Sequence, residues 1–322
     1  MMAPMSTVVV GGGSWGSVFA ALLAERGHRV VLACRDPEQA RAIEATGRNP
    51  RYVPGLDLSG VQARTIADAA VAEADFVCLA VPSRGFREVV SALPGSAPAL
   101  ILTKGLDPAT GERLSRVVGD RPAAVLSGPN HAEEIAQGLP AAAVIASEDG
   151  GLAERLQHAI ISPRFRVYVN SDPTGVEFCA AAKNVIALAA GAADGLEIGD
   201  NAKAALITRG SAEFARLGSA YGARPETFAG LAGMGDLIVT CWSRHSRNRR
   251  AGELIARGAS PEEAIASIGM VVEGVTAAPV LRDLAAGLGL ELPITEAVCQ
   301  VLTGARLTDL VSNLMGREPT EE

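Results

Sequence analysis

A single lysine lies in the middle of the most apolar stretch of this sequence. The segment Val176–Ala193 reads VEFCAAAKNVIALAAGAA, which predicts a buried helix of roughly four to five turns carrying Lys183 and then Asn184. Burial penalises a charged ammonium group, so such a lysine must be paired, extend to water along its stem, or line a cavity. The last case suits a catalytic lysine beside an amide that could hold a substrate hydroxyl.

A second candidate site is the glycine-rich stretch GGGSWG at residues 11–16. It follows the β-branched run Thr7–Val10 and precedes an amphipathic stretch, and a further strand pattern comes next. This is the context that a dinucleotide-binding turn requires. Gly11 permits the tight turn, Gly13 lets backbone amides approach the pyrophosphate, and Gly16 lets the helix pack close to the sheet. A glycine turn without a ligand is the alternative interpretation.

The end of the second predicted strand bears on which dinucleotide would bind. An NAD-preferring site has a carboxylate there for the ribose hydroxyls, whereas this sequence has Arg35 followed by Asp36. A guanidinium can hold a 2′-phosphate and stack on adenine, so we expect NADP(H) to be preferred. Asp36 keeps NAD(H) possible, and it could instead cap the helix that starts at Pro37.

Three other turns place polar groups where a ligand could contact them. Lys104 follows the buried run 99–103, and the carboxyl ends of parallel strands are where such folds bind ligands. The turn SGPN at 127–130 also follows a strand, and Glu273 lies between glycines in an apolar stretch. A solvated loop lysine and a simple turn at Glu273 are the alternatives.

Two polar segments of the second half could complete a site. Asp236 and Thr240 are four residues apart and share one face if their segment is helical, although Asp236 could equally be an N-cap. In SRNRR at 246–250, Arg247 could hold a phosphate while Ser246 and Asn248 donate further hydrogen bonds. A solvated basic helix face is the other interpretation of SRNRR.

Alternating strand and helix patterns predict an α/β domain in the first half and an all-α domain in the second. Expected strands are 7–10, 29–34, 75–81, 99–103, 125–128, 141–147 and 165–170, with helices between them. After residue 171 helical periodicity dominates, with breaks expected at Gly191, Gly218, Gly258 and Pro293. We therefore expect domains at 1–171 and 172–322, with an acidic tail at 318–322 that is frayed.

Composition narrows the class of protein. The chain has 322 residues and a net charge of -7, which excludes backbone-driven nucleic-acid binding. Its five cysteines are scattered, so we expect buried thiols rather than disulfides or a metal site. The N-terminus lacks the features of a secretory signal, and the apolar helices carry charges. We expect a cytoplasmic protein without membrane insertion.

A series of sequence motifs along the chain resembles the motifs of one protein family. The motifs are GGGSWG, TKGLDPATG at 103–111, SGPN, AAAKNVIALAAG, NAKAALITRG at 201–210, LAGMGDLIVTC at 231–241, SRNRR and VVEGV. In this order and spacing they resemble the bacterial-type NAD(P)-dependent glycerol-3-phosphate dehydrogenases, over about Thr7 to Gly316. The resemblance implies a Rossmann-type domain, a helical domain like that of 6-phosphogluconate dehydrogenase, and an active site in the cleft between them.

The resemblance also implies an activity and roles for individual residues. The reaction is reversible hydride transfer between NAD(P)H and dihydroxyacetone phosphate, which gives sn-glycerol 3-phosphate for phospholipid synthesis, and a homodimer is possible. The catalytic candidates are Lys183 as proton acceptor, Lys104 and Asp236. Cofactor candidates are Gly11, Gly13, Ser14, Trp15, Gly16, Arg35, Lys104, Ala132, Arg247, Val271 and Glu273. Substrate candidates are Lys104, Gly128, Asn130, Lys183, Asn184, Asp236, Thr240, Ser246, Arg247 and Asn248.

The sequence differs from the usual family motifs at one turn, and two other functions are alternatives to the one that the resemblance implies. Asn130-His131 stand where relatives often have Ser or Thr and then Phe, and we expect Asn130 still to donate and accept hydrogen bonds. Other two-domain dehydrogenases, for hydroxy acids or ketopantoate, share this architecture with an inward lysine. A non-catalytic NADP(H) sensor would keep the glycine turn but would not need Lys104, Lys183 and Asp236 together.

Overall fold

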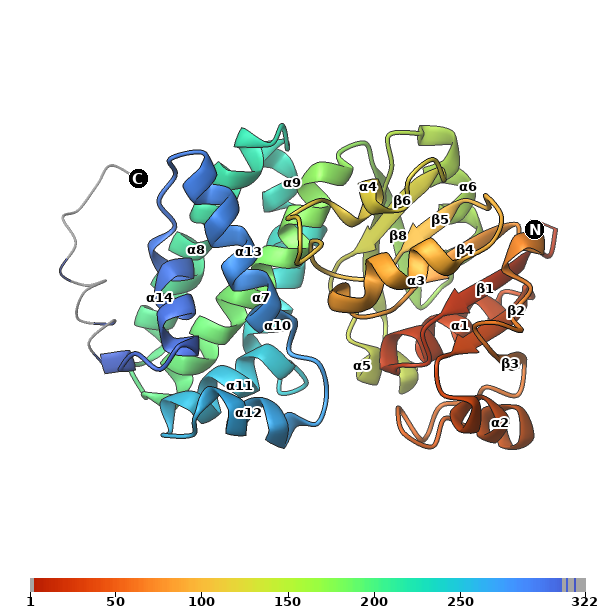
Figure 1. Cartoon of the computed structure of the whole chain (residues 1–322), viewed down its shortest axis with the longest axis horizontal. Coiled ribbons are helices and arrows are strands. Elements are labelled where there is room, and N and C mark those ends of the chain that lie inside the picture. Colours follow the sequence, from red (N-terminus) through yellow and green to blue (C-terminus); the bar gives the residue numbers. More distant parts are fainter. Residues whose placement is uncertain (1–2, 309–310, 312–315, 317–322) are drawn as a thin grey trace.

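The structure is a computed structural model that describes residues 3–308, 311 and 316. It has an α/β part and a helical part that lie side by side, as Figure 1 shows. The α/β part ends with strand β8 at Asn170, and the long helix α7 begins at Pro173. The predicted acidic tail at 318–322 lies outside the described residues.

One eight-stranded sheet forms the first half, in the order β3-β2-β1-β4-β5-β6-β7-β8. Its described pairs are parallel except for β6 with β7. The strands are β1 Ser6–Val10, β2 Arg29–Cys34, β3 Val61–Thr65, β4 Phe76–Leu79, β5 Ala99–Ile101, β6 Ala123–Ser127, β7 Ala141–Ala146 and β8 Phe165–Asn170. In this order β1 and β4 are the switch point, at whose carboxyl ends doubly wound sheets bind ligands.

Helices cover both faces of the sheet because its strands are apolar on both sides. Alternate residues point to opposite faces, so Val9 joins one core with α1 and α6 while Val8 and Val10 join another with α3. The helices of this half are α1 Ser14–Glu25, α2 Pro37–Thr46, α3 Phe86–Ala92, α4 Leu114–Val117, α5 Ala132–Ala136 and α6 Gly150–Ile160, with 3-10 turns η1 Val71–Glu73 and η2 Ser83–Gly85.

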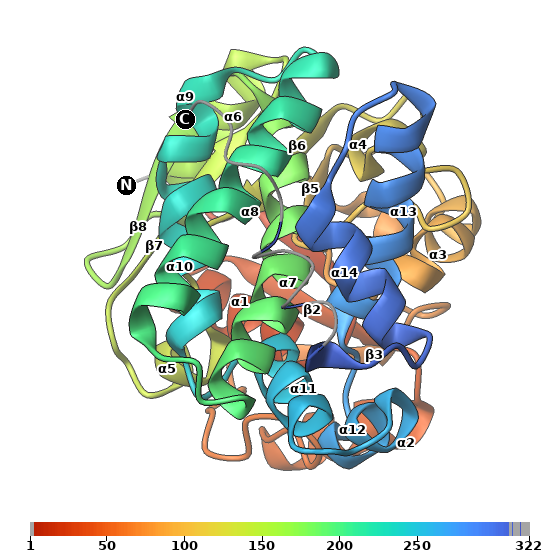
Figure 2. The ribbon, with the colours of Figure 1, turned by 90° about the vertical axis from the view of Figure 1, so that its left-hand side faces the viewer.

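The second half is built around α7, Pro173–Gly195. Figure 2 shows α7 among the other helices of this half, several of which pack on it. They are α8 Asp200–Ala220, α9 Pro225–Ala229, the π-helical turn η3 Leu231–Gly235, α10 Asp236–Trp242, α11 Arg247–Ala256, α12 Pro261–Ile268, α13 Glu273–Gly287 and α14 Pro293–Leu302. The described residues after Asn170 contain no strand.

The predicted helix break at Gly191 is wrong, and the one at Gly218 lies two residues before the actual end of the helix. Gly191 lies inside α7, and Gly218 lies inside α8. A Cβ at Gly191 would lie 1.8 Å from the carbonyl oxygen of Arg249 on α11. A Cβ at Gly218 would lie 2.3 Å from Cζ of Phe228. These glycines therefore permit close packing rather than ending a helix, whereas Pro293 starts α14 as expected.

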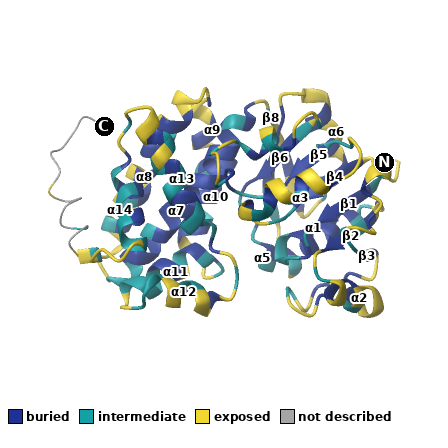
Figure 3. Cartoon of the chain, viewed as in Figure 1, coloured by how far each residue is buried: buried dark blue, intermediate teal, exposed yellow. Residues whose placement is uncertain are grey.

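Helix α7 is long and apolar enough to cross a membrane by length and composition, with a mean hydropathy of 1.4. In the structure 94% of its most apolar window is buried inside the protein. Figure 3 shows the same helix as a mainly buried element. Its apolar surface is thus used in the core of the helical part.

A buried glutamate joins the two parts at the start of α7. Glu177 accepts hydrogen bonds from the backbone N–H of Ser115 (2.9 Å) and from its Oγ (2.5 Å), and Arg113 lies 3.6 Å away. Burial raises the pKa of Glu177 to about 6, although the hydrogen bonds from Ser115 and the charge of Arg113 oppose the rise.

This raised pKa makes stability depend on pH. The folded protein holds the proton more tightly than the unfolded chain, so Glu177 favours folding below pH 4.5 and loses this contribution as the pH rises through 6. We expect wild type to lose about 2 kcal/mol relative to Glu177→Gln over that window. Urea unfolding of both proteins at pH 4.5 and pH 7.5 measures it, and a constant difference would contradict the assignment.

Candidate active site

The centre of the site is one carboxylate that holds two lysines. Asp236, 1% exposed, accepts from Lys183 Nζ through Oδ1 (2.5 Å) and from Lys104 Nζ through Oδ2 (2.9 Å). Ser127 Oγ and the Gly128 N–H also point to Oδ2, at 3.2 and 3.4 Å. Lys183 from α7 and Lys104 from the loop after β5 are 79 positions apart (183 − 104) yet meet here.

Each of these charges shifts the protonation of the others. Burial, with a further contribution from the charge of Lys104, lowers the pKa of Lys183 to about 7, although Asp236 opposes the change. Burial by itself would raise the pKa of Asp236, but the two lysines outweigh it and bring the pKa to about 2. Asp236 is therefore a fixed anion, and Lys183 can give or take a proton near neutral pH.

The turn before α10 points Asp236 into the site. Gly233, in η3, packs so closely that a Cβ would lie 2.1 Å from the Phe228 carbonyl oxygen. Gly235 occupies the N-cap position of α10, so Asp236 is its first residue and not a cap. Thr240, one turn later, accepts from Lys183 Nζ at 3.2 Å, as the shared helix face predicts.

The SGPN turn closes the site from the sheet side. Lys104 Nζ donates to the Gly128 carbonyl (3.2 Å) and to Asn130 Oδ1 (2.7 Å). Nδ2 of Asn130 and Nε2 of His131 are buried without a hydrogen-bond partner among the described residues. Burial lowers the pKa of His131 to about 4, helped by Lys183 and Lys104, so its ring is neutral at pH 7.

The glycine turn fits the pyrophosphate of a dinucleotide. A Cβ at Gly16 would lie 1.9 Å from the Gly11 carbonyl oxygen, whereas none of the residues that the structure describes comes within 4 Å of one at Gly13. Gly13 is the N-cap of α1 and offers no side-chain cap, so the first N–H groups of the helix are free for an anion. Nε1 of Trp15 is buried without a partner in the described part of the chain. Ser14 is the first residue of α1.

The two residues after β2, Arg35 and Asp36, differ in exposure and in their contacts. Arg35 is exposed. Asp36 caps α2 by accepting from the Glu38 N–H (2.9 Å) and pairs with Arg51 (2.9 Å). The capping alternative for Asp36 is confirmed, and Arg35 is left accessible to a ligand beyond β2.

The SRNRR segment and the Glu273 turn meet beside α7. Ser246 caps α11, and Arg247 Nη1 donates to the carbonyl of Val271, which is 42% exposed. Asn248 Nδ2 donates to Asn184 Oδ1 (2.9 Å), while Asn248 Oδ1 accepts from the Gly274 N–H (2.9 Å). These amides brace α7, α11 and α13, and they do not point freely at a ligand. Glu273 accepts from Ser83, and Ala132 is buried at the start of α5.

Known proteins resemble the chain over nearly its whole length. Residues 6–153 and 172–311 match the N-terminal and C-terminal family profiles of NAD-dependent glycerol-3-phosphate dehydrogenase. The chain belongs to this family. It is 50% identical to a glycerol-3-phosphate dehydrogenase [NAD(P)+] of Moorella thermoacetica (98% of this chain, 97% of the relative). The crystal structure of the Coxiella burnetii glycerol-3-phosphate dehydrogenase superposes with a TM-score of 0.93 at 35% identity (98% and 99% covered).

A looser likeness concerns the fold of this glycerol-3-phosphate dehydrogenase family member alone. A ketopantoate reductase from Ralstonia eutropha superposes with a TM-score of 0.63 at 19% identity, over 93% of this chain and 97% of that one. The competing prediction of a ketopantoate-type dehydrogenase therefore has support for its architecture and none for its substrate.

Sequence reasoning missed several residues that shape the site of this family member. Gln39 Nε2 (2.7 Å) and Asn49 Nδ2 (3.0 Å) both donate to the Gly12 carbonyl and hold the glycine turn. Ser83 binds the Glu273 carboxylate of the helical part, as Ser127 of the SGPN turn binds Asp236. The place of Ser83 shortly after the buried strand β4 was a signal in the sequence, whereas Gln39 and Asn49 lie in polar stretches that carry no such signal.

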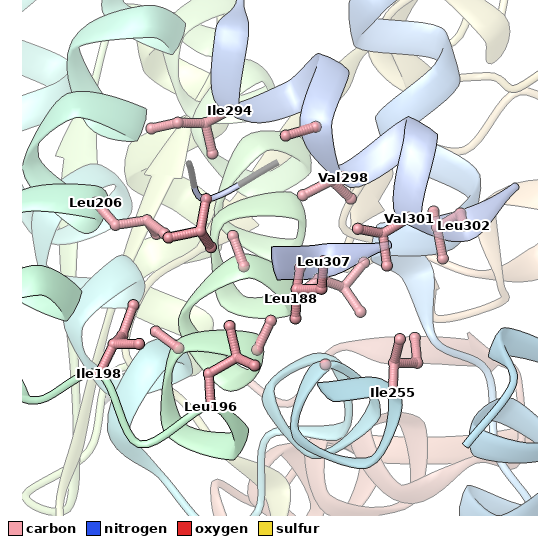
Figure 4. Close-up of a pocket in the computed structure, with 16 residues that line it drawn as sticks. Leu188, Leu196, Ile198, Leu206, Ile255, Ile294, Val298, Val301, Leu302 and Leu307 are labelled. Atoms are coloured by element: carbon pink, nitrogen blue, oxygen red, sulfur yellow. The ribbon is translucent and has the colours of Figure 1, made fainter. Parts of the chain in front are cut away.

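The helical part also contains an apolar pocket, shown in Figure 4. It lies among α7, α8, α11 and α14, and its lining includes Leu188, Leu206, Ile255, Val298 and Leu307. Among the described residues its lining is entirely aliphatic or glycine, without a side chain that could transfer a proton or bind a phosphate. Among the described residues no group of three His, Cys, Asp or Glu side chains could hold a metal ion.

Proposed function

We propose that the protein catalyses reversible hydride transfer between a nicotinamide dinucleotide and C2 of sn-glycerol 3-phosphate, with dihydroxyacetone phosphate as the ketone. One observation carries the proposal: Asp236 holds Lys183 and Lys104 together beside the SGPN turn, in a chain that belongs to this dehydrogenase family. The nicotinamide, when bound, accepts or supplies the hydride. All other steps fall to the side chains described above.

Lys183 is the proton acceptor when the alcohol is oxidised. Its neutral amine takes the proton from the C2 hydroxyl as the hydride leaves the same carbon, and its ammonium form returns the proton in the reverse direction. Burial brings its pKa to about 7, so both forms are present near neutral pH. Thr240 and Asp236 hold Nζ in place.

Lys104 and Asn130 stabilise the oxygen at C2. The Lys104 ammonium is fixed by Asp236 and Asn130, so its charge is preorganised for a developing alkoxide. The unpartnered Nδ2 of Asn130 is free to donate to a substrate oxygen. The Gly128 carbonyl also accepts from Lys104, while Asn184 supports the substrate side indirectly by bracing α7 against Asn248.

Arg247 and the start of α11 hold the phosphate of the substrate. The helix begins at Arg247 after the cap Ser246, so its free N–H groups and partial positive charge lie beside a guanidinium. Asn248 supports this end by fixing Asn184 and the Gly274 N–H.

Loss of this phosphate contact should weaken substrate binding more than it slows the chemistry. In Arg247→Ala we expect KM for dihydroxyacetone phosphate to rise about 100-fold, with kcat lowered by less than about tenfold. Initial rates over a range of substrate concentrations give both constants. Exposed Arg244, just before the cap, provides the control, because Arg244→Ala removes a nearby charge and should leave KM within about twofold. Equal effects of the two variants would argue against a specific phosphate contact.

The dinucleotide lies on the glycine turn, with Ser14, Trp15 and the N-terminus of α1 at its phosphates. We propose that NADP(H) is preferred because Arg35 is exposed beyond β2 while Asp36 is engaged as a cap and with Arg51. Val271, Glu273, Ala132 and Arg247 complete the cofactor side of this proposal.

The remaining proposals concern organisation and biological role. We keep the division into a dinucleotide domain at 1–171 and a substrate domain at 172–322. A homodimer in the cytoplasm that supplies glycerol phosphate for phospholipid synthesis follows from the family resemblance.

One experiment tests the proposed function directly. The oxidation of NADPH and of NADH is followed with dihydroxyacetone phosphate and with unphosphorylated dihydroxyacetone. We expect rapid turnover with the phosphate alone and a lower KM for NADPH than for NADH. Turnover of neither ketone, despite tight NADPH binding, would overturn the substrate and favour a dinucleotide sensor.

A further inference from the structure

Ser83 connects the α/β part to the helical part close to the loop that carries Lys104. It begins η2 after β4, is 2% exposed, and gives both of its donors to one carboxylate. Its backbone N–H donates to Glu273 Oε1 (3.2 Å) and its Oγ donates to Glu273 Oε2 (2.6 Å). Glu273 is the first residue of α13, so this carboxylate comes from the other half of the protein.

The segment that carries Ser83 also supports the glycine turn. A Cβ at Gly11 would lie 2.4 Å from the Ala80 carbonyl oxygen, so the turn rests directly on the chain three residues before Ser83. Thr103 Oγ1 donates to the Val81 carbonyl (2.7 Å) and ties the end of β5 to the same segment. A Cβ at Gly105, next to Lys104, would lie 3.3 Å from Cβ of Ser83.

The backbone of Glu273 is fixed from the opposite side. The neighbouring Gly274 N–H donates to Asn248 Oδ1 (2.9 Å), and a Cβ at Gly274 would lie 2.6 Å from the Asn184 carbonyl oxygen. The start of α13 is therefore anchored to α7 and α11, while its carboxylate reaches across to Ser83. The pair thus joins the segment beneath the glycine turn to the start of α13.

We propose that Ser83 is a positioning residue for dinucleotide binding, which it controls by holding the Glu273 carboxylate against the loop after β4. The inference rests on the proposed function in one respect, since it takes the glycine turn as the dinucleotide site. Without the hydroxyl, Glu273 keeps one backbone donor and can turn toward the bound phosphates. An unheld anion beside an anionic ligand weakens binding.

The chain offers a matched control for this inference. Ser115 donates its N–H and its Oγ to Glu177 in the same two-bond arrangement, also across the interface between the two parts. Ser115 lies on α4, which packs on β6 and α3 rather than on the glycine turn. Ser83→Ala and Ser115→Ala therefore remove the same group from similar surroundings, and only the first should affect the dinucleotide.

Calorimetric titration with NADPH, without substrate, tests the inference. We expect the Kd to rise about tenfold in Ser83→Ala and to change less than twofold in Ser115→Ala, with similar decreases in Tm. In a Glu273→Ala background, Ser83→Ala should have no further effect on the Kd, because Ser83 acts through Glu273. An unchanged Kd in Ser83→Ala, equal changes in the two serine variants, or additive effects would overturn the inference.

Two further outcomes separate this inference from the proposed function. If Ser83→Ala does not fold, Ser83→Cys and Ser115→Cys give the same comparison, because a thiol has nearly the shape of the hydroxyl but donates a much weaker hydrogen bond and leaves both glutamates charged. A wild-type protein that binds NADPH but does not reduce dihydroxyacetone phosphate would overturn the proposed substrate, while the NADPH titrations still decide the role of Ser83. A wild-type protein that binds neither NADPH nor NADH would overturn both.

Discussion

Lys183→Ala is expected to fold, to bind NADPH, and to lose turnover by a factor of about 10⁴ in both directions. The loss combines the missing proton acceptor with the missing charge beside C2. Folding should survive because Asp236 keeps Lys104, Ser127 and the Gly128 N–H as partners. Initial rates, circular dichroism and NADPH titration measure the three properties, and near-normal turnover would eliminate Lys183 as the proton acceptor.

Lys203 is the matched control for this variant. It is 4% exposed and is paired with Asp194 at 2.8 Å, but it lies on α8 outside the Asp236 cluster. Lys203→Ala should therefore lose stability and keep its turnover.

In wild type the oxidation rate should rise as the pH increases through about 7, because Lys183 must be neutral to accept a proton, and the reduction rate should fall. Parallel profiles in the two directions would point to another titrating group.

Asp236→Asn is expected to have the second largest effect, and an asymmetric one. Asp236 raises the pKa of Lys183, so its loss leaves this lysine neutral at pH 7 and removes the partner that orients both ammonium groups. Reduction needs the protonated lysine, so we expect kcat to fall about 10³-fold for reduction and about 10²-fold for oxidation. Rates in both directions at pH 7 measure this ratio.

Asp194 supplies the control, since it also accepts from two cations. Lys203 Nζ (2.8 Å) and Arg249 Nε (2.6 Å) both donate to it, in the same helical part. These pairs are only partly buried, so Asp194→Asn should lose some stability, but less than the loss of one partner of a fully buried pair. Asp194→Asn should keep turnover in both directions. Symmetric losses in Asp236→Asn, or a loss of activity in Asp194→Asn, would count against the proposed role of Asp236.

Local sequence patterns were enough to predict most of the fold. The alternation of apolar strands with helices and the loss of strand signals after residue 171 predicted the α/β part and the helical part. Strand β3, Val61–Thr65, was missed because its sequence VQART carries only a weak apolar pattern at the edge of the sheet. Gly191 was misread because a glycine that ends a helix and one that admits a neighbouring helix look alike in sequence.

The sequence by itself determined the types of chemistry available: a glycine turn for a dinucleotide, an apolar helix with one lysine, and motifs of a dehydrogenase family. Only the tertiary structure decided which charges meet. Lys183 could have been paired, solvated or facing a cavity, and Asp236 settles this as its partner from 53 residues away. Likewise, only the fold shows that Asn184 and Asn248 bind one another and that Glu273 binds Ser83. The burial of a side chain and the identity of its charged or hydrogen-bonded partner depend on long-range packing, which local sequence periodicity does not encode.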